Sequence, residues 1–235
     1  VCTELAVMGQ ACWVGLSASG LAQLAMKGEQ TLSALTRAGL DLSTADVREP
    51  LGADDRDGSG GTYFYRNKME FSFSAQRWLT DWEIATGEKH DTDFAIGLHV
   101  PGRFDKVLDL NACYLQSEWS ARLVNGVRQF AKDNGWKPWH SHEHRGYLRI
   151  LAVRQSAHTE DRMVNLVTSG YKPERIEAFA AFRKTEFPEV TTLINTINSG
   201  VAQTAFGDEV HTVFGPGIIR DTIGPHTFEI ASNAF

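Results

Sequence analysis

The sequence lacks the features that mark several classes of protein. No run approaches the eighteen or more apolar residues of a membrane-spanning helix, and the first twenty residues have no basic start of the kind that opens a signal peptide. Only three cysteines occur in 235 residues, Cys2, Cys12 and Cys113. So few cysteines, and an odd number of them, do not make a disulfide scaffold and favour a reducing compartment, the cytoplasm.

An excess of positive charge is also missing. The chain carries 23 Lys and Arg against 29 Asp and Glu, a formal charge of −6. This balance argues against a protein that coats nucleic acid nonspecifically, because that mode draws its affinity from many phosphate contacts. Site-specific binding stays open if cations gather on one face. Apolar residues make up 42% of the chain, as in ordinary globular proteins, and its length suits one large or two small domains.

The periodicity of apolar residues predicts an α+β fold, with mainly antiparallel sheets and a few flanking helices. Residues 1–19 form an irregular, cysteine-bearing segment ahead of a larger region at 20–235. Loops are expected at 40–62, 76–93 and 135–146. Helices are expected at 21–38, 115–133 and 172–184, and strands at 63–75, 94–100, 106–110, 147–155, 162–168, 190–197, 209–214, 217–223 and 227–231.

The stretch at 63–74 organises the rest of the chain. Its second half alternates Met69, Phe71 and Phe73 with small or polar residues, the period of a strand with one buried face. Arg66 and Lys68 stand just ahead, and on a strand they would share a face. They are either two solvated side chains or a pair of clamps for phosphate or carboxylate groups. Aromatic rings beside such cations are what a single-stranded nucleic acid needs.

Four motifs carry a resemblance to a known family. They are Tyr-Arg-Asn-Lys-Met-Glu-Phe-Ser-Phe at 65–73, the Gly-Leu-His and Gly-Arg-Phe-Asp segment at 96–107 with Cys-Tyr-Leu at 113–115, Gly-Tyr-Leu-Arg-Ile-Leu-Ala-Val-Arg at 146–154, and the stretch 227–235. In this order they resemble the RNA uridine-5-methyltransferases, which make 5-methyluridine in ribosomal and transfer RNA. The resemblance covers about 20–235 and identifies that region as the central RNA-recognition part of such an enzyme.

The resemblance implies a specific chemistry. Enzymes of this family flip a uridine out of a single-stranded RNA loop, add a Cys thiolate to carbon-6, and transfer a methyl group from S-adenosylmethionine to carbon-5. The domain that binds the methyl donor would follow Phe235. No Gly-x-Gly-x-x-Gly-like turn after an apolar strand occurs in 1–235, and no cysteine stands in the family's nucleophile context. We therefore expect the enzyme to be active in its full-length form and these residues alone to be inactive.

What the resemblance leaves to this chain is RNA contact. It implies that Arg66, Lys68, Arg149 and Arg154 clamp the RNA backbone and that Phe235 packs against the flipped base. Two alternatives stay open. Arg149 and Arg154 could instead form ion pairs at a strand edge with Glu160 or Asp161, and Phe235 could be an ordinary core residue.

Two segments invite metal-binding hypotheses. Many relatives in the resembled family hold a [4Fe–4S] cluster on four cysteines, and Cys2, Cys12 and Cys113 could supply three of the ligands. The second family cysteine falls near Gly9, which has no sulfur, so a degenerate cluster and its loss are both open. The run His140-Ser141-His142-Glu143-His144 suggests zinc ligands, but no further ligand follows at fixed spacing, and a solvated loop is the simpler interpretation.

Three hypotheses for the function follow. The chain is the RNA-recognition region of a 5-methyluridine methyltransferase, a stand-alone RNA-binding module, or a scaffold for a methyltransferase supplied by another chain. For the first of these, the predicted partner is a single-stranded loop of ribosomal or transfer RNA, with no membrane and no obligate protein partner.

Overall fold

The computed structural model describes residues 20–52 and 63–234. The chain forms two compact units, and the boundary between them in the sequence falls between Tyr65 and Arg66. The predicted segment 1–19 lies outside the described residues. In the first unit, α3 (Gly20–Arg37) confirms the first predicted helix. It ends as the glycine at 39 predicts: Gly39 has a left-handed φ of 81°, and the amides of Gly39 and Leu40 donate to the carbonyls of Thr36 and Leu35.

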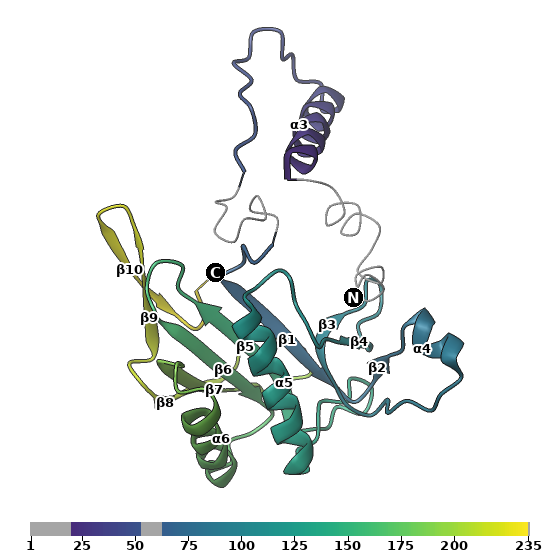
Figure 1. Ribbon diagram of the computed structural model, residues 1–235, viewed down its shortest axis with the longest axis vertical. Helices are drawn as coiled ribbons and strands as arrows, with labels where there is room; N and C mark the ends of the chain where they lie inside the picture. Colours follow the sequence, from purple (N-terminus) through teal and green to yellow (C-terminus); the bar gives the residue numbers. More distant parts are fainter. Residues whose placement is uncertain (1–19, 53–62, 235) are drawn as a thin grey trace. The chain divides into compact units, whose positions relative to one another are not determined.

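The second unit is built on an eight-stranded sheet in the order β2-β4-β3-β1-β5-β6-β7-β8 (Figure 1). Only β2–β4 and β6–β7 pair in parallel, so the predicted α+β fold with mainly antiparallel pairing is confirmed. The strands of this sheet are β1 (Lys68–Ser74), β2 (Arg77–Trp78), β3 (Ala95–His99), β4 (Val107–Asp109), β5 (Leu148–Gln155), β6 (Arg162–Thr168), β7 (Thr192–Ile197) and β8 (Glu209–Phe214).

Two long helices pack together on one face of the sheet, α5 (Glu118–Asp133) and α6 (Pro173–Glu186) (Figure 1). Helix α5 turns Leu123, Val127 and Ala131 inward at helical spacing. The rings of Phe130 on α5 and Phe182 on α6 stack at 4.5 Å between centroids, which joins the two helices. No helix among the described residues is both long and apolar enough to cross a bilayer.

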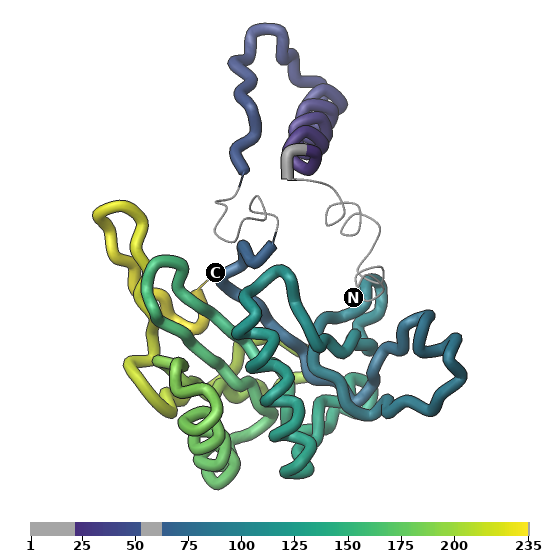
Figure 2. The backbone as a smooth tube through the Cα atoms, viewed as in Figure 1, coloured from purple at the N-terminus to yellow at the C-terminus, as the bar shows by residue number. Residues whose placement is uncertain are grey.

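A separate hairpin, β9 (Ile218–Ile223) and β10 (His226–Ala231), covers part of the other face. Its Ile219 is buried against Met163 of β6 and Ile194 of β7. Strand β9 of the hairpin lies beside the loop that joins β5 to β6 (Figure 2), where the Thr159 hydroxyl donates to the carbonyl of Arg220. The strands predicted at 217–223 and 227–231 are thus present, as a hairpin packed on the main sheet.

Two local predictions were wrong. Residues 63–67 are not part of the strand, because Phe64 has a left-handed φ of 54° and the regular strand begins at Lys68. The segment 76–93 is not all loop, since it holds β2 and the short helix α4 (Asp81–Thr86). A capping box starts this helix: Thr80 Oγ1 accepts from the amide of Glu83, and the Glu83 carboxylate accepts from the amide of Thr80.

Candidate nucleic-acid interface

Alternation along β1 and β5 gives the sheet two unlike faces. Met69, Phe71 and Phe73 are at most 4% exposed and point to the side covered by α5 and α6. Lys68, Glu70 and Ser72 point to the opposite side, called here the Lys68 face. Because Lys68 is the register partner of Arg154, the Arg154 side chain belongs to the Lys68 face as well.

Lys68, Glu70 and Arg154 form a cluster at one corner of this face. The Lys68 ammonium lies 2.9 Å from a Glu70 carboxylate oxygen and donates to the carbonyl of Ala234 at 3.4 Å. Arg154 donates to the same carbonyl. Burial lowers the pKa of Arg154 and nearby Glu70 counters that shift, so the guanidinium stays charged. The chain just before Phe235 is therefore held by two cations of neighbouring strands.

Arg66 lies ahead of β1 and not on it. Its amide donates to the carbonyl of Leu115 at 2.8 Å, which fixes the backbone, while its side chain is exposed and donates to the sulfur of Met69 at 3.8 Å. Within the described parts of the chain it has no carboxylate partner. Of the predicted clamps, Arg66 is thus the one whose guanidinium is open to solvent.

Arg149 is in a different environment. Its side chain is fully buried and donates to four carbonyls, those of Asn198, Gly200, Val201 and Ala202, at 2.6 to 3.2 Å. The guanidinium carbon also lies 3.9 Å from the centre of the Trp139 ring. A guanidinium enclosed in this way has no side left for a phosphate. Arg149 organises the loop after β7, and we do not propose it as an RNA clamp.

The alternative of ion pairs with the β5–β6 loop was wrong for both arginines. Glu160 lies 3.9 Å from Arg162, and the carboxylate of Asp161 accepts the backbone amide of Arg220. Asp221 ties the hairpin to this loop by accepting the amides of Ala157 and His158 at 2.8 and 3.0 Å. Asp161 and Asp221 therefore join the β5–β6 loop to the hairpin, while Glu160 lies near Arg162 at the start of β6.

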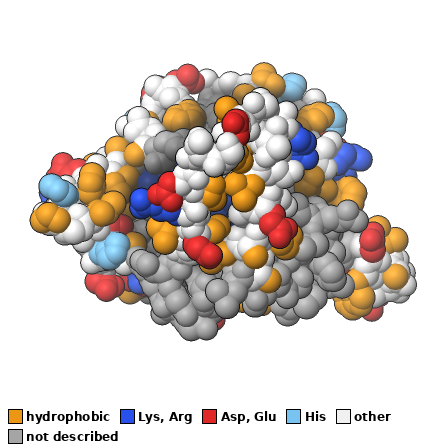
Figure 3. Space-filling model, turned by 90° about the horizontal axis from the view of Figure 1, so that it is seen from above, with side chains coloured by type: hydrophobic (Ala, Val, Ile, Leu, Met, Phe, Trp, Pro, Cys, Tyr) orange, Lys and Arg blue, Asp and Glu red, His pale blue; other side chains and the backbone are white. Residues whose placement is uncertain are grey.

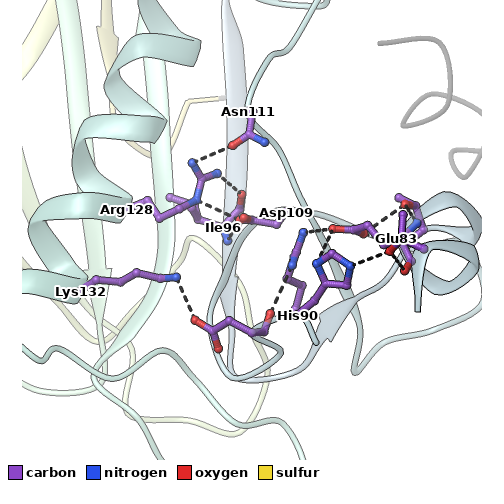
Figure 4. Close-up of polar contacts among 11 residues, drawn as sticks. Glu83, His90, Ile96, Asp109, Asn111, Arg128 and Lys132 are labelled. Carbon is purple, nitrogen blue, oxygen red and sulfur yellow. Dashed lines mark hydrogen bonds and ion pairs between the residues drawn. The ribbon is translucent and has the colours of Figure 1, made fainter. Parts of the chain in front are cut away.

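The described surface has no continuous basic area in the view of Figure 3, where Lys and Arg lie in small groups beside acidic and apolar side chains. Polar contacts account for several cations. Arg128 on α5 donates to Asp109 and to the carbonyl of Leu110, and Arg77 binds Glu83 (Figure 4). These contacts join α5 to β4 and β2 to α4, so these two arginines stabilise the fold.

Of the predicted cysteine ligands, the structure describes one. Cys2 and Cys12 lie outside the described residues, and Cys113 is a free, buried thiol. Across 20–52 and 63–234, no three His, Cys, Asp or Glu side chains are placed to hold a metal ion. In the histidine run, His142 lies 3.5 Å from Asp105, and His140 accepts the amide of Glu143 at 3.2 Å. Phe235 also lies outside the described residues.

Comparison with known proteins shows what this chain is similar to. An uncharacterized RNA methyltransferase of Chlorobaculum tepidum is 35% identical over the whole chain and 47% of its own length, and one of Porphyromonas gingivalis is 30% identical over the whole chain and 49% of its own length. The chain thus spans about half the length of these curated relatives. No family model matches it.

The fold is shared with solved structures. One of them is the Pyrococcus abyssi tRNA (uracil-54, C5)-methyltransferase in complex with S-adenosyl-L-homocysteine, with a TM-score of 0.56 and 18% identity over 74% of this chain and 37% of that one. The likeness concerns architecture alone. The relatives that match along the whole of this chain confirm the relationship that the four motifs predict: this chain belongs with the RNA methyltransferase family.

Proposed function

We propose that this chain is the RNA-contacting part of an S-adenosylmethionine-dependent methyltransferase that modifies carbon-5 of a uridine in transfer or ribosomal RNA. The observation that carries the proposal is the 35% identity, along the entire chain, to a protein named as an RNA methyltransferase. The uridine specificity is supported by the four motifs and by the fold shared with a uracil-C5 enzyme. A cytoplasmic location stays a prediction from the low cysteine content.

Within this proposal, the RNA backbone is contacted at the start of β1 and the end of β5, by Arg66, Lys68 and Arg154. Arg66 is exposed and without a carboxylate partner in the described residues, so it can take a phosphate directly. Lys68 and Arg154 add positive charge at the corner where Ala234 is held. Contact of Phe235 with the flipped base stays a prediction. Glu70 offsets part of this charge, so Arg66 should contribute most to affinity.

The proposal is tested by measuring how the RNA affinity of alanine variants depends on salt concentration. We expect Arg66→Ala and Lys68→Ala to weaken binding of a uridine-bearing RNA loop, and each lost phosphate contact to reduce the slope of log K against log salt by about 0.7. Arg220→Ala is the matched control, because Arg220 is exposed and already paired with Glu229 at 2.9 Å. Unchanged affinity and slope in both variants would refute the RNA-contact proposal.

Calorimetry with S-adenosylmethionine tests whether these 235 residues contact RNA without binding the methyl donor. We expect no binding by the 235-residue chain, because its sequence has neither a Gly-rich donor turn nor a cysteine in the nucleophile context. Clear micromolar binding would contradict this part of the proposal and leave the RNA contacts untouched.

A further inference from the structure

We call the cluster of Lys68, Glu70 and Arg154 the Lys68 corner. A large cavity lies at the other end of strands β1 and β5 from this corner. Its volume is about 790 Å³, within the range of ligand-binding pockets. Ala75 at the end of β1, Tyr147 at the start of β5 and Lys172 ahead of α6 all line it. Ala75 comes seven positions after Lys68 along the chain, and Tyr147 comes seven positions before Arg154. At ~3.3 Å per residue the cavity lies about 23 Å from the Lys68 corner.

Cations outnumber carboxylates around the cavity. Five line it, Lys132, Lys137, Arg145, Lys172 and Arg175, against the three carboxylates of Asp91, Asp93 and Glu143. Two of the cations are paired: Lys132 lies 3.1 Å from Asp91 (Figure 4), and Arg145 contacts Glu143. The other three have no salt bridge within the described residues. Even with Asp93 among the lining residues, the cavity keeps an excess of positive charge.

Buried aromatic rings hold two of these three cations in place. The Arg175 guanidinium lies 4.6 Å from the centre of the Tyr147 ring and 5.5 Å from that of Trp136, and the Lys172 ammonium lies 5.5 Å from the Tyr147 ring. Both rings are only 5% exposed. A cation over a ring face keeps its N–H groups for another partner, so Lys172 and Arg175 can still donate to a phosphate.

The Tyr147 hydroxyl does not neutralise these cations. Burial raises its pKa to about 12, so the ring stays uncharged at physiological pH. Glycine at 146 lets the chain reach this geometry. It has φ 129°, and a Cβ there would collide with the carbonyl of Pro138, so the wall of the cavity depends on this close backbone approach.

We propose that this cavity is a second subsite for the RNA backbone, which binds phosphates of the strand that also contacts the Lys68 corner. The inference rests on the proposed function, since it deepens the same RNA recognition. At a stacked spacing of ~3.4 Å per nucleotide, a strand that reaches both sites needs about seven nucleotides. The chain would therefore bind a segment of RNA of at least about seven nucleotides, and not a single loop nucleotide alone.

Lysine footprinting tests the subsite residue by residue. The 235-residue chain is acetylated with and without a uridine-bearing RNA of about twenty nucleotides, and the modified lysines are quantified by mass spectrometry. We expect RNA to reduce the reactivity of Lys137 and Lys172 severalfold. Lys184 is the matched control, because it is exposed at the other end of α6, about 18 Å from Lys172. Its reactivity should not change.

The outcomes separate this inference from the proposed function. Protection of Lys68 without Lys137 and Lys172 would overturn the subsite and leave the RNA-contact proposal standing. Protection of no lysine would overturn both, and equal protection of Lys184 would indicate nonspecific coating and also overturn the subsite. A four-nucleotide RNA, too short to span about 23 Å, should protect one site or the other less well than the long RNA.

Discussion

The two ends of β5 place an arginine in unlike surroundings. Arg149, near the start of the strand, is fully buried, bonded to four carbonyls and stacked on Trp139. Arg154, near the end, is 6% exposed and donates to the carbonyl of Ala234 on the Lys68 face. Both occur in one motif at 146–154, and the motif alone does not distinguish them.

Under the RNA-contact proposal, this one motif combines a structural arginine, Arg149, with a binding one, Arg154. At the start of β5, Arg149 satisfies backbone groups of a loop that makes few regular hydrogen bonds of its own. At the end, Arg154 joins β1, β5 and the chain before Phe235. Substitution at the start should therefore unfold the protein, while substitution at the end should chiefly alter RNA affinity. The following predictions test that contrast, from the largest expected effect to the smallest.

Arg149→Met should have the largest effect on stability. It removes the four hydrogen bonds that Arg149 donates to carbonyls of 198–202, of which the bond to Asn198 is buried, and a hydrogen bond to a charged group is worth about 1.5–3 kcal/mol. We expect the free energy of unfolding to fall by at least about 3 kcal/mol in urea titrations. A fall below 1 kcal/mol would show that the loop does not depend on this side chain.

Gly146→Ala should come next, at the same end of β5. The added Cβ would meet the Pro138 carbonyl and the Trp139 backbone, and φ 129° is strained for alanine. We expect a loss of about 1–3 kcal/mol, measured by thermal or urea unfolding. Gly170→Ala is the control, since a Cβ at Gly170 meets nothing within 4 Å. Equal stability of the two variants would contradict the close approach at Gly146.

Asp221→Asn probes the hairpin anchor beyond the other end of β5. Burial favours the neutral acid, but hydrogen bonds from the amides of Ala157 and Thr222, and from Ser156 and His158, hold the pKa of Asp221 far below its ordinary 3.8. The ionised carboxylate therefore adds stability above pH 3.8 that is lost as the pH falls through the lower folded-state pKa. At pH 7 the variant should lose about 1.5–3 kcal/mol.

The gap between Asp221→Asn and the parent chain should narrow below pH 3.8, because the unfolded chain then takes up a proton on Asp221 that the folded carboxylate, with its lowered pKa, does not. Urea titrations at pH 7 and at pH 3 measure this. A gap that is the same at both values would show that the charge of Asp221 plays no part in the anchor.

Arg154→Ala should have the smallest effect on folding and a clear effect on binding. We expect stability to fall by about 1 kcal/mol, the value of a typical hydrogen bond, and the salt slope of RNA binding to fall by about 0.7. Arg220→Ala should change neither quantity appreciably. If Arg154→Ala destabilises the chain as much as Arg149→Met and leaves the slope unchanged, the two arginines do not differ in role.

Much of this architecture follows from local patterns. The alternation of Met69, Phe71 and Phe73 gave β1, and Gly39 gave the end of α3, because each depends on neighbouring residues. The short helix at 81–86 was missed although the Thr80–Glu83 capping box was visible in the sequence. The roles of Arg149 and Arg154 could not be separated, since the carbonyls they bind lie 49 to 80 residues away along the chain.

The cavity at the far end of the sheet was also beyond sequence reasoning. Lys137 and Tyr147 fell at or beside a segment predicted to be a polar connection, and Lys172 and Arg175 within a predicted amphipathic helix. Only the fold places them together, through the return of β5 beside β1 and the start of α6 next to Tyr147. Cations close to aromatic residues in both segments were the available signal.

Cross-linking of RNA that carries 4-thiouridine, with the attachment points mapped by mass spectrometry, tests the central claim most directly. The account predicts adducts at Arg66, at Lys68 and Glu70 on the Lys68 face, and near Arg154, and none on the outer surface of α5. Adducts confined to the helices, or absent from residues 66–72, would contradict it.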